Sequence, residues 1–229
     1  MDESLSLTRY LYNKTKVFRK LSISIAENNY DESLFWAYEL YFSWLSIETI
    51  DYLFEILEMR LPKYRCLYKF LFKKKTQWLQ NDICEKPHNI IATIIKNILI
   101  RNPNIPEPDY QYYFTISMKD IESYKTMHIT PVYRTLSTVC KYNLVDTEYK
   151  IDITQEQREL LTDFCDNWLY YASKIPLWEY RISQYNGEVD PIAKKITFEN
   201  DDFLEEFFDK YGFEPYEQTI EIQRRLVGI

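Results

Sequence analysis

The sequence predicts an all-α fold, a multi-helical bundle of antiparallel helices that also allows a minor β-hairpin near the C-terminus. Apolar residues recur at helical spacing through most of the 229 residues. Several of these segments begin with Ser, Thr or Asn, followed three residues later by an acidic or amide side chain, which is typical of helix starts. The connections are short, as between antiparallel neighbours. We therefore expect roughly 60–70% helix, about twice the usual share.

The first two predicted helices form the centre of the N-terminal region. The first carries Val17, Leu21 and Ile25 on one face. Asn29 with Glu32 opens the second, DESLFWAYELYFSW, which is apolar nearly all round. A helix without a polar face is normally buried between neighbours. We therefore expect this helix to be central and both of its tryptophans, Trp36 and Trp44, to be buried.

Three more helices are predicted before residue 103. Ser46 caps the third and Pro62 stops it, the fourth runs from Lys63 to about Gln80, and the fifth has Pro87 in its first turn. The apolar stripe of the third helix is Ile47, Ile50, Leu53, Phe54, Leu57 and Leu61. That of the fourth is Tyr64, Leu67, Tyr68, Leu71, Phe72, Trp78 and Leu79. That of the fifth is Ile90, Ile91, Ile94, Ile95, Ile98 and Leu99.

A proline-rich segment, NPNIPEPD, predicts the domain boundary. It divides the chain into an N-terminal helical bundle at 1–101, a linker at 102–109 and a mainly helical acidic region at 110–229. Residues 1–101 contain 15 Lys/Arg and 12 Asp/Glu, whereas residues 102–229 contain 13 and 23. The two parts therefore differ in charge, net +3 against net −10.

The acidic region is predicted to begin with a short strand at 110–116 and to continue mainly as helices. Helix starts are predicted at Ser117 with Asp120, at Thr130-Pro131, at Thr154 with Gln157, and after Pro176. Asn186-Gly187 predicts a turn, and Lys195–Phe198 a strand that Glu188-Val189 can pair with. Asn200 caps a further helix that Gly212 closes in the left-handed conformation, and a last helix begins around Pro215.

Composition predicts a globular, cytosolic protein. Hydrophobic residues make up 46% and charged residues 28%, which argues against wholesale disorder. The longest apolar candidate, Ile90 to Ile100, is too short and too polar to span a bilayer. The first residues, MDESLSLTRY, are acidic and polar, the reverse of a signal peptide.

Two aromatic-rich segments have distinctive sequences: ESLFWAYELYFSW, Glu32 to Trp44, and NWLYYASKIPLWEYRISQYNGEVDPIAKKITFENDDFLEEFFDKYGFEPYEQ, Asn167 to Gln218. Together they cover 65 of 229 residues, and they resemble an uncharacterised family of giant DNA viruses related to mimivirus. The resemblance implies a viral origin and carries over no functional residue. SIAENNYDESLFWAYEL is also similar, in helix packing alone, to the helix-turn-helix of clamp-loader collar domains.

No residue pattern predicts a catalytic site, a metal site or a cofactor. His88 and His128 have no ligand at metal spacing, and a loop that cradles phosphate is nearly excluded by the presence of only three glycines. The cysteines lack a CxxC spacing, so we expect reduced core thiols rather than disulfides: Cys66, Cys84, Cys140 and Cys165. An acidic cluster is explained by the dipole at a helix start, with a divalent-metal site as the alternative: Glu199, Asp201, Asp202, Glu205 and Glu206.

The strongest feature outside the core is basic. Seven cations fall within 16 residues: Arg60, Lys63, Arg65, Lys69, Lys73, Lys74 and Lys75. On the fourth helix Arg65, Lys69 and Lys73 form an i, i+4, i+8 stripe that Lys63 and Lys74 adjoin, opposite the apolar stripe. This basic face can bind nucleic-acid phosphates or a protein partner, or it can simply be solvated.

The function that the sequence favours is a non-enzymatic protein–protein interaction or scaffold protein of a giant DNA virus, in the host cytoplasm (the viral factory) or the virion. Its partner is a protein of unknown identity, with no cofactor and no membrane. The alternative is a nucleic-acid-associated accessory subunit of viral replication, transcription or translation. A third reading is an enzyme with an unfamiliar carboxylate site.

Overall fold

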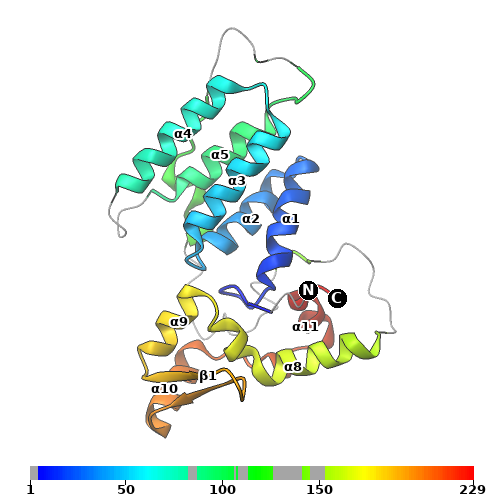
Figure 1. Ribbon diagram of the computed structural model, residues 1–229, viewed down its shortest axis with the longest axis vertical. Coiled ribbons are helices and arrows are strands. Elements are labelled where there is room, and N and C mark those ends of the chain that lie inside the picture. The colour runs from blue at the N-terminus through cyan, green and yellow to red at the C-terminus, as the bar shows by residue number, and fades with distance from the viewer. Residues whose placement is uncertain (1–4, 82–86, 106, 108–112, 126–140, 145–152) are drawn as a thin grey trace. The chain divides into compact units, whose positions relative to one another are not determined.

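The computed structural model describes residues 5–81, 87–105, 107, 113–125, 141–144 and 153–229 (Figure 1). Of these residues 64% are helical, in ten α-helices and two 3-10 helices, and the described part has one two-stranded antiparallel hairpin. The predicted fold class is therefore confirmed. In the described part of the chain no helix is long and apolar enough to cross a bilayer.

The chain forms two compact units, each assembled from separated stretches of sequence. Unit 1 comprises Met1–Phe18, Phe42–Leu45 and Met127–Ile229, and unit 2 comprises Arg19–Tyr41 and Ser46–Thr126. These limits differ from the predicted division at 102–109, because residues 1–18 and 42–45 belong to unit 1 and unit 2 continues to Thr126. The Tyr64 hydroxyl donates to the carbonyl oxygens of Asn102 and Ile105 (3.1 and 3.0 Å), which holds residues 102–105 against α4.

Unit 2 is a bundle around one helix that has almost no exposed side. Its helices are the end of α1 (Lys14–Ala26), α2 (Tyr30–Tyr41), α3 (Ser46–Arg60), α4 (Arg65–Gln80), α5 (Asn89–Leu99) and α6 (Glu122–Lys125). Nine of the 12 residues of α2 are buried, and the helix packs against α3, α5 and α6. Trp36 is fully buried and donates to Glu32 (3.0 Å), so the central position predicted for this helix is confirmed.

The prediction that Trp44 lies in the core is wrong. Helix α2 ends at Tyr41, and Trp44 has a φ of +66° and is 50% exposed. The chain leaves the helix here because it is bound within unit 1. The Ser43 hydroxyl accepts the backbone N–H of Arg9 (2.8 Å), and the Arg9 guanidinium lies over the Phe42 ring at 5.0 Å. The Trp44 ring lies 5.0 Å from that of Tyr180.

The structure describes residues 113–116 of the strand predicted at 110–116, and for these residues the prediction is wrong. Residues 113–116 form no strand ladder and lie along one edge of α5. Polar side chains at i, i+4 and i+8 of that helix bind their backbone: Asn89, Thr93 and Asn97. The capping box predicted at Ser117 with Asp120 is confirmed and opens a 3-10 helix, Met118–Ile121.

Unit 1 packs helices and a hairpin around buried aromatic rings (Figure 1). Its elements are the start of α1, α8 (Gln155–Ala172), α9 (Pro176–Ser183), β1 (Gly187–Asp190), β2 (Lys195–Phe198), α10 (Asp201–Tyr211), a 3-10 helix (Pro215–Glu217) and α11 (Ile220–Val227). Glu188 pairs with Thr197 and Val189 with Ile196, so the predicted hairpin is confirmed. Trp178 is fully buried and donates to the carbonyl of Thr8 (3.1 Å). The helix predicted at Thr130 lies outside the described residues.

The predicted left-handed cap at Gly212 is also wrong, although the residue does follow the last turn of α10. Its φ is −64° and its ψ 124°, which is extended backbone. Glycine is needed for another reason, because a Cβ atom here would lie 2.6 Å from the carbonyl oxygen of Phe208. The close approach lets the Gly212 N–H donate to that same carbonyl (2.9 Å).

Candidate functional site

Helix α4 presents the basic face that the sequence predicted. The segment from Arg60 to Gln80 contains no acidic residue. Lys63, Arg65, Lys69 and Lys73 are all exposed. In the described part of the chain none of these four side chains forms an ion pair. The fifth predicted member, Lys74, is half-buried, with its ammonium 5.8 Å from the centre of the Phe70 ring. The face therefore carries four cations open to a partner.

The two other cations of this segment are used within unit 2. Lys75 forms an ion pair with Asp51 and lies over the Phe54 ring at 5.1 Å. Arg60 donates to the carbonyl of Ile25 at the end of α1 (2.9 Å). The sequence alone could not separate these structural cations from the open ones, because their partners lie 24 and 35 residues away.

Aromatic side chains flank the basic stripe. Only one narrow side of α4 is buried, and its residues are Leu67, Leu71 and Trp78. Phe72 lies 100° around the helix from Leu71 and is 50% exposed. Its ring stacks on that of Tyr68, with centroids 6.0 Å apart and planes 15° apart. The apolar stripe predicted for this helix was thus too wide, since it included Phe72 and Leu79, which are exposed. The stripe predicted for α3 likewise included Ile47, which is exposed.

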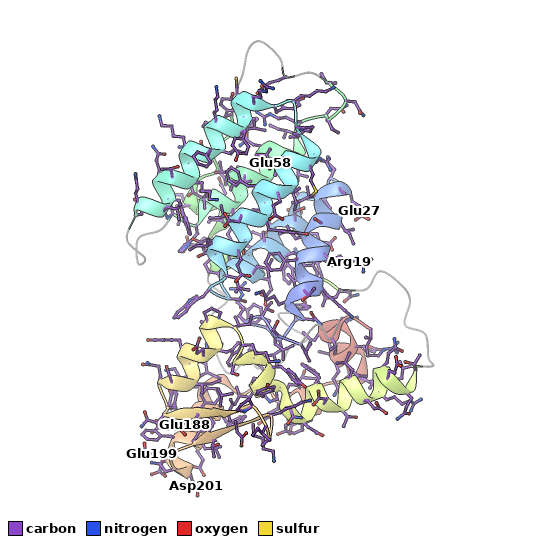
Figure 2. All side chains as sticks on the ribbon, viewed as in Figure 1. Arg19, Glu27, Glu58, Glu188, Glu199 and Asp201 are labelled. Carbon is purple, nitrogen blue, oxygen red and sulfur yellow. The ribbon has the colours of Figure 1, made fainter. Side chains whose placement is uncertain are left out.

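An apolar hollow of about 400 Å³ opens where the end of α3 meets the start of α4. It is lined by Leu57, Glu58, Leu61, Pro62, Tyr64, Arg65, Tyr68 and Lys69. Leucine and tyrosine surfaces form most of its wall, and Arg65 and Lys69 bring the basic stripe to its edge. Glu58, labelled in Figure 2, adds one carboxylate. Partial burial, followed by the hydrogen bond and the charge of Glu58, raises the pKa of Tyr68.

The N-terminus of α4 is closed by a carboxylate of the chain itself. The backbone N–H groups of Cys66 and Leu67 donate to the two carboxylate oxygens of Glu107 (3.1 and 3.0 Å). Such amides, together with the helix dipole, favour an anion at this position. Sequence analysis missed this contact, because Glu107 lies 40 residues away in a segment interpreted as a linker.

A second titratable cluster, in unit 1, stabilises the hairpin loop. Lys194 donates to the Tyr171 hydroxyl (2.9 Å) and to the carboxylate of Asp163 (3.1 Å), which also accepts from Tyr171 and Asn167. The hydrogen bonds with Tyr171 and then Asp163 raise the pKa of Lys194. Partial burial alone would raise the pKa of Asp163, but the three hydrogen bonds outweigh it and lower that pKa. Both shifts favour the charged forms, so this cluster is an ion pair at neutral pH.

The predicted histidine and cysteine positions show no catalytic arrangement in the described residues. His88 Nδ1 lies 3.1 Å from the hydroxyl of Tyr41, and burial raises the pKa of that tyrosine to about 12. Cys66 is exposed, contrary to the expected core position, whereas Cys165 is half-buried and burial raises its pKa to about 11. Both thiols are free. His128, Cys84 and Cys140 lie outside the described residues.

The acidic cluster is explained by a helix start. The Asn200 side chain accepts the N–H of Phe203 (2.9 Å), and Asp201 and Asp202 occupy the first turn of α10. Figure 2 labels Asp201 here with Glu188 and Glu199 of the hairpin. Within the described ranges no three His, Cys, Asp or Glu side chains lie close enough together to hold a metal ion.

Comparisons with known proteins add no relative from which a role could be transferred. No protein-family model matches the chain, no curated protein matches it, and no solved structure matches it.

Proposed function

We propose that the protein is a non-enzymatic interaction protein whose α3–α4 surface binds an acidic segment of a protein partner. One observation carries this proposal: an apolar hollow of about 400 Å³ is bordered by cations, Arg65 and Lys69, that form no ion pair in the described part of the chain. A partner side chain such as leucine would fill the hollow, and carboxylates beside it would meet the basic stripe.

The two parts of the surface have different physical roles. Burial of an apolar anchor in a pocket supplies most of the affinity of a typical interface. Exposed cations contribute mainly to the association rate and to the orientation of the partner. Glu58 favours a protein over a nucleic acid, because its carboxylate repels phosphate at the wall of the hollow and can accept a hydrogen bond from a partner's N–H.

A specific observation supports nucleic acid as the second candidate. Phe72 and Tyr68 stack beside the open cations, and exposed aromatic rings among cations are typical of surfaces that bind single-stranded nucleic acid. In that case phosphates would contact the stripe and a base would stack on Phe72. Each phosphate contact would make the affinity salt-dependent.

Fluorescence anisotropy distinguishes the two candidates. The probes are an acidic peptide with a central leucine, the same peptide with serine in place of leucine, and mixed-sequence single-stranded RNA and DNA. We expect micromolar binding of the leucine peptide, at least tenfold weaker binding of the serine peptide, and little binding of either nucleic acid. Salt-sensitive RNA or DNA binding together with no peptide binding would replace the proposal with the second candidate.

Two variants locate the binding surface. Lys69→Glu/Lys73→Glu should abolish binding of the leucine peptide, and Phe72→Ser should weaken it, while the thermal unfolding of both variants stays close to that of the parent. Lys195→Glu, at an exposed position in unit 1, is the control and should bind like the parent. Equal binding by the parent and the double variant would place the site elsewhere.

The place of action follows from the sequence resemblance and is part of the proposal. A protein of a giant DNA virus with this surface would act in the host cytoplasm, in the viral factory, or in the virion. Immunofluorescence of infected cells and mass spectrometry of purified virions would test this, and absence from both would overturn it.

A further inference from the structure

The geometry points to a second copy of this chain as the partner, with α10 of one copy binding the α3–α4 surface of the other. This inference rests on the proposed function, since it names the acidic segment that the surface takes. Helix α10, Asp201–Tyr211, has the required chemistry, because it is acidic, amphipathic and exposed on one side.

The two helices carry matching stripes of opposite charge. On α4 the stripe is Arg65, Lys69 and Lys73, and on α10 it is Asp201, Glu205 and Asp209. Both follow i, i+4, i+8 spacing, so each spans about 12 Å along its helix and turns through about 80°. Two helices laid side by side in the same direction can therefore bring the three cations opposite the three carboxylates, with Arg65 opposite Asp201.

The acidic stripe is open to a partner. All three of its carboxylates are exposed, and none forms an ion pair in the described part of the chain. The helix is anchored from its other side, where Phe207 is fully buried. Lys210 lies off the stripe and donates to the Tyr185 hydroxyl (3.3 Å).

Each stripe has an exposed apolar residue beside it. Leu204 of α10 is 39% exposed and lies within one helical turn of Asp201 and Glu205. Phe72 of α4 is 50% exposed, lies within one helical turn of Lys69 and stacks on Tyr68, which lines the apolar hollow. Leu204 is the side chain that would enter the hollow. The contact thus combines an apolar anchor with three charge pairs, as the proposed surface requires.

The contact joins different surfaces of the two copies. A pair in which each α10 reaches the other copy's α4 would close as a dimer, whereas a one-way contact would continue into a ring or a fibre. Because the charge pairs are solvent-exposed at their edges, association should weaken as salt screens them.

A charge-swap experiment on the full chain tests the inference by sedimentation velocity. The parent should associate at about 50 mM salt and dissociate at about 500 mM, where the Debye length is below 5 Å. Lys69→Glu/Lys73→Glu and Glu205→Lys/Asp209→Lys should each be monomeric alone. An equimolar mixture of the two should associate again, since each then offers the other a complementary stripe.

Two further proteins make the result specific. The chain that carries all four substitutions has two of the three charges in each stripe exchanged, so every charge pair is complementary again and the chain should self-associate like the parent. The control Glu156→Lys/Glu159→Lys makes the same change of charge as Glu205→Lys/Asp209→Lys, at exposed positions near the start of α8, and should keep the parent's association. Circular dichroism checks that every variant is folded.

Several outcomes would overturn the inference. They are a monomeric parent at low salt, a mixture of variants that stays monomeric, or loss of association in the Glu156→Lys/Glu159→Lys control. If the parent is monomeric but still binds the acidic leucine peptide, the proposed function stands and only the second copy is excluded. If neither association nor peptide binding occurs, both proposals fail.

Discussion

Asn97 of α5 and Phe114 exchange two hydrogen bonds, so that a side-chain amide on a helix pairs with an extended backbone as a neighbouring strand would. Asn97 Nδ2 donates to the Phe114 carbonyl (2.7 Å), and the Phe114 N–H donates to Asn97 Oδ1 (3.1 Å). One turn earlier the Ile116 N–H donates to the hydroxyl of Thr93 (3.1 Å). These contacts satisfy the backbone of a segment that has no strand partner among the described residues.

Replacing Asn97 should therefore destabilise unit 2. Asn97→Leu keeps the volume but removes both hydrogen bonds between this side chain and the Phe114 backbone, which should cost about 2–3 kcal/mol. Thr93→Val removes one acceptor without changing the shape and should cost about 1 kcal/mol. Urea unfolding measures both values. A loss in Asn97→Leu no greater than that in Thr93→Val would show that the paired amide adds no stability.

The two tryptophans at the end of the α2 segment should differ in their contribution to stability. Trp36 is fully buried, so Trp36→Ala should lower the free energy of unfolding by about 3–5 kcal/mol. Trp44 is half exposed and has a positive φ, so Trp44→Ala should cost less than about 1 kcal/mol. Thermal unfolding of the two variants tests this pair. Equal losses would place Trp44 in the core, as the sequence predicted.

Substitutions at Gly212 separate two reasons for a glycine after a helix. A left-handed position would tolerate asparagine better than alanine. Because any Cβ here meets the carbonyl of Phe208, Gly212→Ala and Gly212→Asn should instead both be destabilising, by about 1–3 kcal/mol. Chemical denaturation of the two variants measures the difference. Parent-like stability of the asparagine variant would contradict the extended conformation.

The ion pair of Lys194 and Asp163 should make stability depend on pH in acid. The pKa of Asp163 is lower in the folded chain, so its contribution is present above the unfolded pKa of about 4 and is lost as pH falls through the folded value. Lys194→Met should therefore melt below the parent at pH 7, and the two curves should converge near pH 2. Lys195→Met, an exposed neighbour, should melt like the parent at every pH. A constant difference between the Lys194→Met and parent curves would exclude the ion pair as its cause.

Local patterns predicted the elements that depend on neighbouring residues. The capping boxes at Ser117 and Thr154, the cap at Asn200 and the pairing of Glu188-Val189 with Lys195–Phe198 all form as expected, because each is decided within a few residues. The basic stripe of α4 was likewise readable, since i, i+4 spacing puts its cations on one side of any helix.

Distant contacts decided the features that sequence analysis missed. Trp44 leaves its helix because residues 42–45 bind Arg9, which is 34 residues from Ser43. Residues 102–105 pack within unit 2 because the Tyr64 hydroxyl binds their backbone, and residues 113–116 are extended without a strand because Asn97 binds them. The apolar hollow requires α3 and α4 to meet, and spacing within one helix gives no sign of that.

The burial of α2 on every side has a consequence for synthesis of the chain on the ribosome. Its partners α3 and α5 follow it in sequence, and α5 ends only at Leu99. Until α5 emerges, the nascent chain exposes α2, which has four aromatic side chains among its last seven residues: Phe35, Trp36, Tyr38 and Tyr41. Such apolar surface is prone to aggregation and is recognised by chaperones. Fragments truncated before Leu99 should therefore aggregate or remain bound to a chaperone, whereas fragments that extend through α5 can bury this surface.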